Sequence, residues 1–190
     1  MSATREFRSL ADAIVDELLA AEPVMATWLG DHRFDDRLPD WSDVPGLVRG
    51  LDDRLATLDG IDHLELDVDD AVDLEILRAS VTHARFSLSE LRSLTWNPME
   101  WNPGTALHLL ASRPDADAQV ARERMAGRVG AIPEFLAQAR AHLQEMPRVH
   151  VETAIAQLQG TIGLLQTQVR GIVADDALVD GAVGEVEEFA

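Results

Sequence analysis

The chain has 190 residues, a formal net charge of −18 and no cysteine. Its length suffices for one domain with its own hydrophobic core, and the lack of cysteine excludes disulfides, thiolate zinc sites and thiol catalysis. Such an acidic chain, with no basic cluster, would repel phosphate groups, which excludes nucleic acid and anionic membranes as partners.

The first predicted elements are helices. Apolar residues recur at helical spacing from Phe7 to Leu19 and predict an amphipathic surface helix. This N-terminal region has neither a secretory hydrophobic segment nor an apolar run that could cross a bilayer, so we expect a cytoplasmic location. Pro23 is expected to begin a short helix that Gly30 ends. An acidic loop over 31–42 follows.

Two longer helices come next. Ser42 or Asp43 is expected to cap a helix that runs from about 45 to 58. Asp67 is then a good N-cap for a long helix over about 67–94, which we expect to be the central helix of the domain.

Two Trp-Asn-Pro units follow five residues apart. Each proline disfavours a helical conformation for the asparagine before it, which predicts a rigid corner between helices. In one interpretation the indoles complete the core and the asparagines cap or bridge backbone groups. In the other, Trp96, Asn97, Trp101 and Asn102 line one wall of a cleft that holds a peptide or another extended ligand.

The last third predicts helices over about 104–112, 115–130, 133–144 and 149–173. The helix over 149–173 has a heptad-like apolar pattern, and its Gly160 and Gly163 are expected to admit a close neighbouring backbone. Residues 174–184 predict a loop, followed by the start of a truncated helix. We therefore expect an all-α bundle of about six to eight helices, with a single domain over 1–173 and an irregular tail over 174–190.

Candidate chemistry is sparse. The His-Glu-x-x-His motif of helical zinc hydrolases is absent, and the six scattered histidines are best interpreted as packed or solvated. The acidic loop, which includes Asp35 and Asp36, suggests a calcium loop or paired carboxylates, but it lacks the ligand spacing of an EF-hand and more plausibly forms turn and ion-pair contacts. We predict no catalytic, cofactor-binding or metal-binding residue in this chain.

Several landmarks in sequence order resemble the N-terminal region of the bacterial domain of unknown function 885 family. They are Pro23–His32, Asp35–Ser42, Phe86–Arg92 with Trp96–Pro98, Ile132–Leu136 and Arg148–Gln157. Members of that family are all-helical and resemble gluzincin-type zinc metallopeptidases with His-Glu-x-x-His in their C-terminal half. The resemblance implies that this chain is the part without the metal site, that zinc belongs to the missing half, and that the full-length protein binds a peptide substrate.

Two functional hypotheses result. In the first, the chain is a truncated, inactive N-terminal portion of a zinc-dependent peptidase-like protein and shapes a peptide-binding cleft. In the second, it is a stand-alone acidic helical module without enzymatic activity, which binds another protein through its acidic face or through an exposed stripe of the helix over 149–173. Removal of further helices would leave an apolar face exposed, through which the chain is expected to self-associate.

Overall fold

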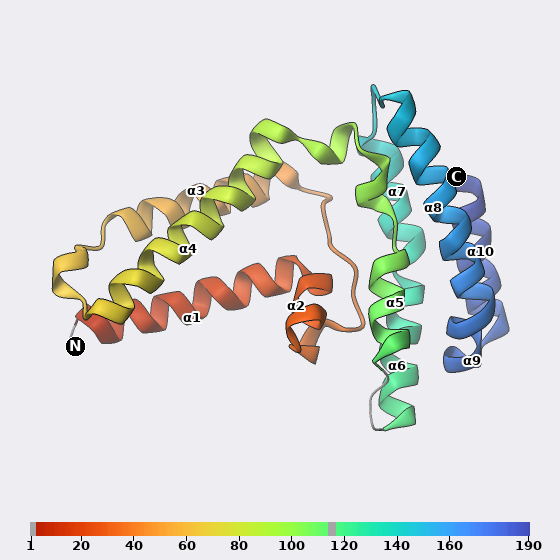
Figure 1. Ribbon diagram of the computed structural model, residues 1–190, viewed down its shortest axis with the longest axis horizontal. Coiled ribbons are helices and arrows are strands. Elements are labelled where there is room, and N and C mark those ends of the chain that lie inside the picture. The colour runs from red at the N-terminus through yellow and green to blue at the C-terminus, as the bar shows by residue number, and fades with distance from the viewer. Residues whose placement is uncertain (1–2, 114–116) are drawn as a thin grey trace. The chain divides into compact units, whose positions relative to one another are not determined.

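The computed structural model describes residues 3–113 and 117–190. Every regular element in these ranges is helical, which confirms the all-α prediction. The chain divides into two compact units (Figure 1). Unit 1 comprises Met1–Leu19 and Trp41–Ser93, and unit 2 comprises Ala20–Asp40 and Leu94–Ala190. That residues 1–173 act as one domain stays a prediction.

Unit 1 is built from three long helices and two short elements. They are α1 (Ala3–Ala21, whose end belongs to unit 2), α3 (Val44–Asp59), η2 (His63–Glu65), α4 (Val68–Phe86) and η3 (Ser87–Leu91). In Figure 1, α3 and α4 lie side by side, and they share the most extensive packing in the unit. Asp43 accepts a hydrogen bond from the Gly46 amide at 2.9 Å, and Asp67 accepts one from the Asp70 amide at 2.9 Å. Both predicted N-caps are confirmed.

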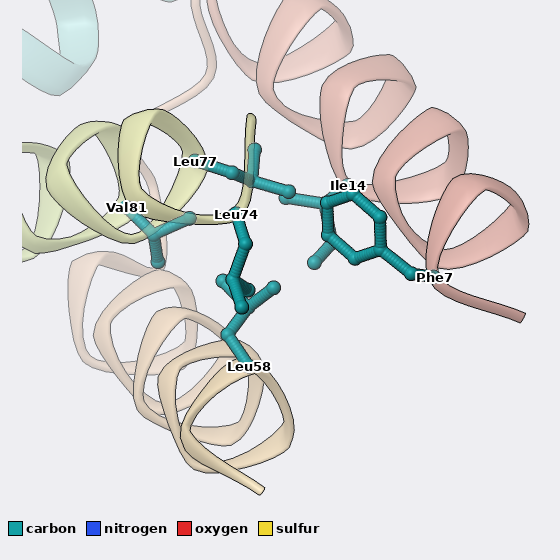
Figure 2. Packing of buried hydrophobic residues seen from close by; sticks show 6 residues of the cluster. All are labelled: Phe7, Ile14, Leu58, Leu74, Leu77 and Val81. Carbon is teal, nitrogen blue, oxygen red and sulfur yellow. The ribbon is translucent and has the colours of Figure 1, made fainter. Parts of the chain in front are cut away.

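The core of unit 1 is an aliphatic cluster with one aromatic ring (Figure 2). In Figure 2, Phe7 and Ile14 of α1 and Leu58 of α3 point into the space between the three helices, and α4 contributes the remaining side chains. These are Leu74, Leu77 and Val81. Their spacings of seven, three and four residues place them on one face of each helix, so the apolar periodicity of the sequence becomes the packed interior.

One ion pair adds to this core. The Arg8 guanidinium of α1 donates to the Asp70 carboxylate of α4 at 2.9 Å, and Asp70 is only 3% exposed. The hydrogen bond and the charge of Asp70 raise the pKa of Arg8 above its usual value. A carboxylate buried this deeply needs such a partner, so Arg8 is part of what holds α1 on α4.

The predicted central helix over 67–94 is shorter than expected. The α-helix ends at Phe86, a π-helical turn covers Ser87–Leu91, and Arg92 has φ of 51°. The hydroxyl of Ser89 donates to the carbonyl oxygen of Arg85 at 2.9 Å. A serine hydroxyl on that carbonyl competes with the regular backbone bond, and a left-handed residue then stops the helix.

Unit 2 contains the remaining helices. They are α2 (Pro23–Leu29), η1 (His32–Phe34), η5 (Pro98–Trp101), α5 (Gly104–Ser112), α6 (Ala118–Gly130), α7 (Ile132–His142), α8 (Arg148–Leu164), η6 (Leu165–Val169), α9 (Arg170–Val173) and α10 (Asp176–Phe189). A further turn, η4 (Ser93–Thr95), begins at the boundary with unit 1. Gly30 ends α2 in a left-handed conformation with φ of 90°, as predicted. The predicted start of α6 at 115 lies partly outside the described residues, and Asp117 caps the helix.

The C-terminal segment differs from its prediction. Residues 174–184 do not form a loop, because α10 begins at Asp176 and continues to Phe189. Asp175 caps it by accepting from the Leu178 amide at 3.1 Å. Its buried face consists of Val179, Ala182, Val183 and Val186. Burial of that face offsets the low helix propensity of Gly181 and Gly184.

The two glycines of α8 also differ from their prediction. A Cβ placed on Gly160 or Gly163 would meet no atom within 4 Å, so no neighbouring backbone approaches there. The close approach occurs instead at Gly127 of α6, where such a Cβ would lie 2.8 Å from Cβ of Asp36 and 3.1 Å from its carbonyl oxygen. The predicted helix over 149–173 is further interrupted by the π-helical turn η6.

Candidate functional site

The second tryptophan of the corner belongs to the core of unit 2. Trp101 is 0% exposed, and its indole nitrogen donates to the carbonyl oxygen of Leu94 at 3.1 Å. Its ring packs against Phe135 with centroids 5.2 Å apart and stacks on His142 at 5.7 Å. An indole enclosed on all sides fixes the corner and offers no surface to a ligand.

The two asparagines hold the backbone of the corner. Oδ1 of Asn97 accepts from the Met99 amide at 3.2 Å and caps η5. Oδ1 of Asn102 accepts from the Gly104 amide at 2.9 Å and from the hydroxyl of Thr161 at 2.7 Å. The second bond joins the corner to α8. Asn97 therefore caps a short helix, whereas Asn102 bridges the corner and α8.

The first tryptophan lies at a more accessible position. Trp96 is half-buried, and its ring lies 5.1 Å from the His150 ring at a tilt of 54°. Nδ1 of His150 is shielded from solvent and has no hydrogen-bond partner among the described residues. Sequence reasoning missed His150 as part of this surface, because nothing in the pattern relates a helix start to a tryptophan more than fifty residues earlier.

Two carboxylates flank the same corner. Nδ2 of Asn97 donates to Oε1 of Glu100 at 3.2 Å, and Glu100 is exposed. Surrounding protein atoms, and secondarily the negative charge of Glu100, raise the pKa of Glu22 to about 7. The surface formed by Trp96, Asn97, Glu100 and His150 is called the corner surface below.

The acidic loop is fixed by a buried network. Asp35 is 1% exposed and accepts from the hydroxyl of Thr27 at 2.6 Å. Its other oxygen lies 2.8 Å from Nδ1 of His32 and 3.5 Å from a guanidinium nitrogen of Arg124. Asp35 thus joins α2, the loop and α6, and its oxygens face protein groups and not a ligand.

Arg128 is the centre of that network. Its side chain is fully buried and donates to the carbonyl oxygens of Arg37 at 2.9 Å and Ala106 at 3.0 Å. It also donates to the carbonyl oxygen of Phe34 at 3.3 Å and to the Thr27 hydroxyl at 3.0 Å. Burial lowers the pKa of Arg128 to about 10 against the opposing effect of nearby carboxylates. The guanidinium therefore adds a positive charge to a buried cluster that contains Asp35, and it fastens the loop on α6.

Asp36 has a different environment from Asp35. Its side chain is exposed and lies 3.5 Å from Nε of Arg37, the local ion pair that the sequence suggests. Its backbone rests against Gly127. The predicted site residues therefore fall into two groups: Asp35 and Asp36 serve the loop, while the tryptophans and asparagines serve the corner.

The part of the chain that the structure describes contains neither a metal cluster nor a membrane span. Within residues 3–113 and 117–190, no three His, Asp or Glu side chains are grouped so that they could hold a metal ion. In the same ranges, no helix is both long and apolar enough to cross a membrane.

A second candidate surface lies on unit 1. An open groove of about 740 Å³ runs along α4 and η2, and we call it the α4 groove. Its apolar lining includes Leu64, Val68, Val72, Ile76 and Ala79, and its acidic lining includes Asp67 and Glu75. Val68 is 80% exposed and Leu64 is 79% exposed, so aliphatic side chains that normally avoid water are presented to it.

Comparisons with known proteins identify a family and a fold. Residues 23–188 match the family described as bacterial protein of unknown function (DUF885). The fold is similar to a solved structure of a putative lipoprotein of unknown function from Shewanella oneidensis, with a TM-score of 0.82 and 18% sequence identity. That similarity covers 96% of this chain and 36% of the other, so the chain spans about a third of the longer protein's length. A search of the curated proteins gives no match.

Proposed function

Because the chain belongs to the bacterial protein family of unknown function DUF885, we propose that it is the non-catalytic helical portion of a larger zinc-dependent peptidase-like protein. In that protein it shapes one wall of a peptide-binding cleft. The reaction class comes from the resemblance of the family to gluzincin-type peptidases. The motif His-Glu-x-x-His, which such enzymes use to hold zinc and a general base, does not occur in the 190 residues.

The corner surface is the observation that supports this proposal best. Trp96 and His150 form a half-buried aromatic pair whose ring centroids lie 5.1 Å apart. Asn97 and Glu100 add an amide and a carboxylate beside them. Aromatic faces suit the apolar side chains of a peptide, and a few fixed polar atoms suit its backbone amides.

The rigidity of the corner favours ligand binding by the corner surface. The buried Trp101 and the bond from Thr161 to Asn102 hold the corner on unit 2 from behind. A surface that is already ordered loses little conformational entropy when a ligand binds. The similarity covers only 36% of the longer solved chain. If the full-length protein is of similar size, the remainder is large enough to contain a reactive centre.

Metal analysis and a peptidase assay of the purified 190-residue chain test the first part of the proposal. We expect neither stoichiometric zinc nor turnover of peptide substrates by this chain alone. One equivalent of zinc together with peptide hydrolysis would overturn the proposal. Sequencing beyond the codon for Ala190 adds a second test, since a continuing or neighbouring frame should encode His-Glu-x-x-His.

The cleft itself is tested in the product of that longer frame. Replacing Trp96 by alanine should raise KM for a peptide by about tenfold with kcat little changed, because the aromatic contact is made equally in the ground and transition states. Trp28→Ala is a matched control, since Trp28 is a 58% exposed tryptophan of the same unit. If both substitutions raised KM equally, or if neither raised it, the corner surface would have no specific role in binding the peptide.

The α4 groove favours a second candidate function. A stand-alone acidic module that binds another protein would need an exposed apolar surface, and unit 1 has one on α4. Specific binding by the 190-residue chain, with neither zinc nor turnover, would support this function over the first.

A further inference from the structure

The outward face of α4 carries an apolar stripe that the core of unit 1 does not use. Val68, Val72 and Ile76 follow one another at four-residue steps and are 80%, 55% and 59% exposed. The inward face of the same helix holds the buried Leu74, Leu77 and Val81 seen in Figure 2. Helix α4 is therefore apolar on two opposite faces, and only one of them is packed within unit 1.

The flanks of the stripe are acidic. Between Arg54 and Arg78 the sequence has eight acidic residues, no arginine or lysine, and one histidine, His63. Arg8 pairs with Asp67 and Asp70, and Arg78 pairs with Asp59 and Glu75. The remaining acids beside the groove, Glu65, Asp69 and Asp73, are exposed. The groove therefore combines an apolar floor with negative charge on its edges.

This charge pattern selects among the possible occupants. A second copy of the chain would bring the same acidic flanks against themselves, and an anionic membrane would meet the same repulsion. A helix with aliphatic residues at four-residue steps can pack on the apolar floor of the groove, and lysine or arginine beside them can pair with the acidic residues on its edges. From Val68 to Ala79 the groove extends for roughly 16 Å along α4, which matches about three turns of such a helix.

We propose that the α4 groove is a docking site for a basic amphipathic helix of a partner protein. Burial of the aliphatic stripe supplies the affinity, while Glu65, Asp69 and Asp73 orient the partner through its basic residues. The inference names the partner class for the second candidate function and is independent of the peptidase-like function, which concerns unit 2.

Titration of the 190-residue chain with synthetic helices tests the proposal. The probe is an 18-residue leucine and lysine peptide with helical apolar period, at about 0.15 M salt. Two control peptides have the same leucines with glutamate in place of lysine, and the same composition in a scrambled order. We expect saturable one-to-one binding of the periodic lysine peptide and at least about tenfold weaker binding of both controls, because each lacks one of the two complementary features.

Variants of the chain locate the site. V72S/I76S should weaken binding of the periodic lysine peptide at least about tenfold, because two aliphatic contacts are lost. The matched control V149S/I155S changes two exposed aliphatic residues of α8 and should leave the affinity unchanged. D69N/D73N should weaken binding and flatten its dependence on salt. Thermal melts show whether each variant keeps its fold.

Three results would overturn the proposal. Equal binding of the scrambled lysine peptide would show a general attraction of cations to an acidic protein. Equal binding of the glutamate peptide would show that the edges play no part. A dimer that V72S/I76S abolishes, with no peptide binding, would make a second copy the occupant. None of these results affects the zinc and peptidase measurements. The docking site on α4 and the peptidase-like function are therefore tested independently.

Discussion

Thr27 of α2 and Arg128 of α6 are 101 positions apart in sequence and are joined by a 3.0 Å hydrogen bond in which the guanidinium donates to the hydroxyl oxygen. The same hydroxyl donates to Asp35 at 2.6 Å. One threonine therefore links a buried cation to a buried carboxylate. Because neither charge is exposed to water, the loop that contains Asp35 is held by a network that works only when it is complete.

Replacing Thr27 by valine should destabilise unit 2 strongly. The shape of the side chain is conserved, but Arg128 and Asp35 each lose a buried partner, which should cost about 2–3 kcal/mol of unfolding free energy. Thr27→Ser, which keeps the hydroxyl, should recover most of that loss. Urea denaturation followed by tryptophan fluorescence measures the three stabilities.

A matched control for Thr27 is available on α8. Thr153 is exposed and donates its hydroxyl to the carbonyl oxygen of Val149 at 2.7 Å. Thr153→Val makes the same atomic change at the surface and should alter stability by less than about 0.5 kcal/mol. If Thr27→Val cost no more than Thr153→Val, the network around Arg128 would not stabilise the loop.

The two asparagines of the corner should differ in their contribution to stability. Asn102 accepts from both Gly104 and Thr161, whereas the Oδ1 atom of Asn97 caps one short turn. Asn102→Ala should cost about 2 kcal/mol because the Gly104 amide loses its acceptor and the Thr161 hydroxyl loses the shorter of its two hydrogen bonds. Asn97→Ala should cost about 1 kcal/mol, the usual loss of a cap. Denaturation of both variants measures the order, and a larger loss for Asn97→Ala would contradict this account of the corner.

Features determined by neighbouring residues could be predicted from the sequence. The caps at Asp43 and Asp67, the end of α2 at Gly30 and the bounds of α5 agree with the structure. Each depends on residues within one or two turns, where side-chain chemistry decides the backbone directly. The all-α class follows from the same periodicity.

Features that depend on contacts between distant segments could not be predicted from the sequence. The sequence gives no sign that Arg128 fastens the loop over 31–40 or that His150 lies against Trp96. The glycine predictions show the same limit. A pair of glycines inside α8 suggested a close contact, but space around them is open, whereas the unremarkable Gly127 is the one that Asp36 touches.

Those glycines give a paired prediction. Gly127→Ala places a Cβ 2.8 Å from Cβ of Asp36 and should cost about 1–3 kcal/mol, because the backbone of the loop must move. Gly160→Ala has no atom within 4 Å of the new methyl group and should stabilise by about 0.5–1 kcal/mol through helix propensity. Thermal melts should therefore shift in opposite directions, and a stabilising Gly127→Ala would show that the loop does not rest on α6.

Glu22 should give the stability of the chain a distinct pH dependence. Its folded pKa of about 7 lies above the ordinary value of 4.5. The folded state therefore holds the proton more tightly than the unfolded state, so the stability contributed by the neutral carboxyl is fully present below pH 4.5 and is lost as pH rises through about 7. Glu22→Gln should remove this loss. The unfolding free energy of the variant minus that of the wild type should therefore increase between pH 4.5 and about 7 and then level off.

Denaturation curves at several values across that interval measure the effect. Glu22 is exposed to solvent over a substantial part of its surface, so the gain is well below what full burial would give. Glu100→Gln removes the secondary cause of the shift and should move the midpoint of the loss to lower pH without abolishing it, because burial remains. A stability difference between wild type and Glu22→Gln that stays constant with pH would show that Glu22 ionises no later in the folded state than in the unfolded one.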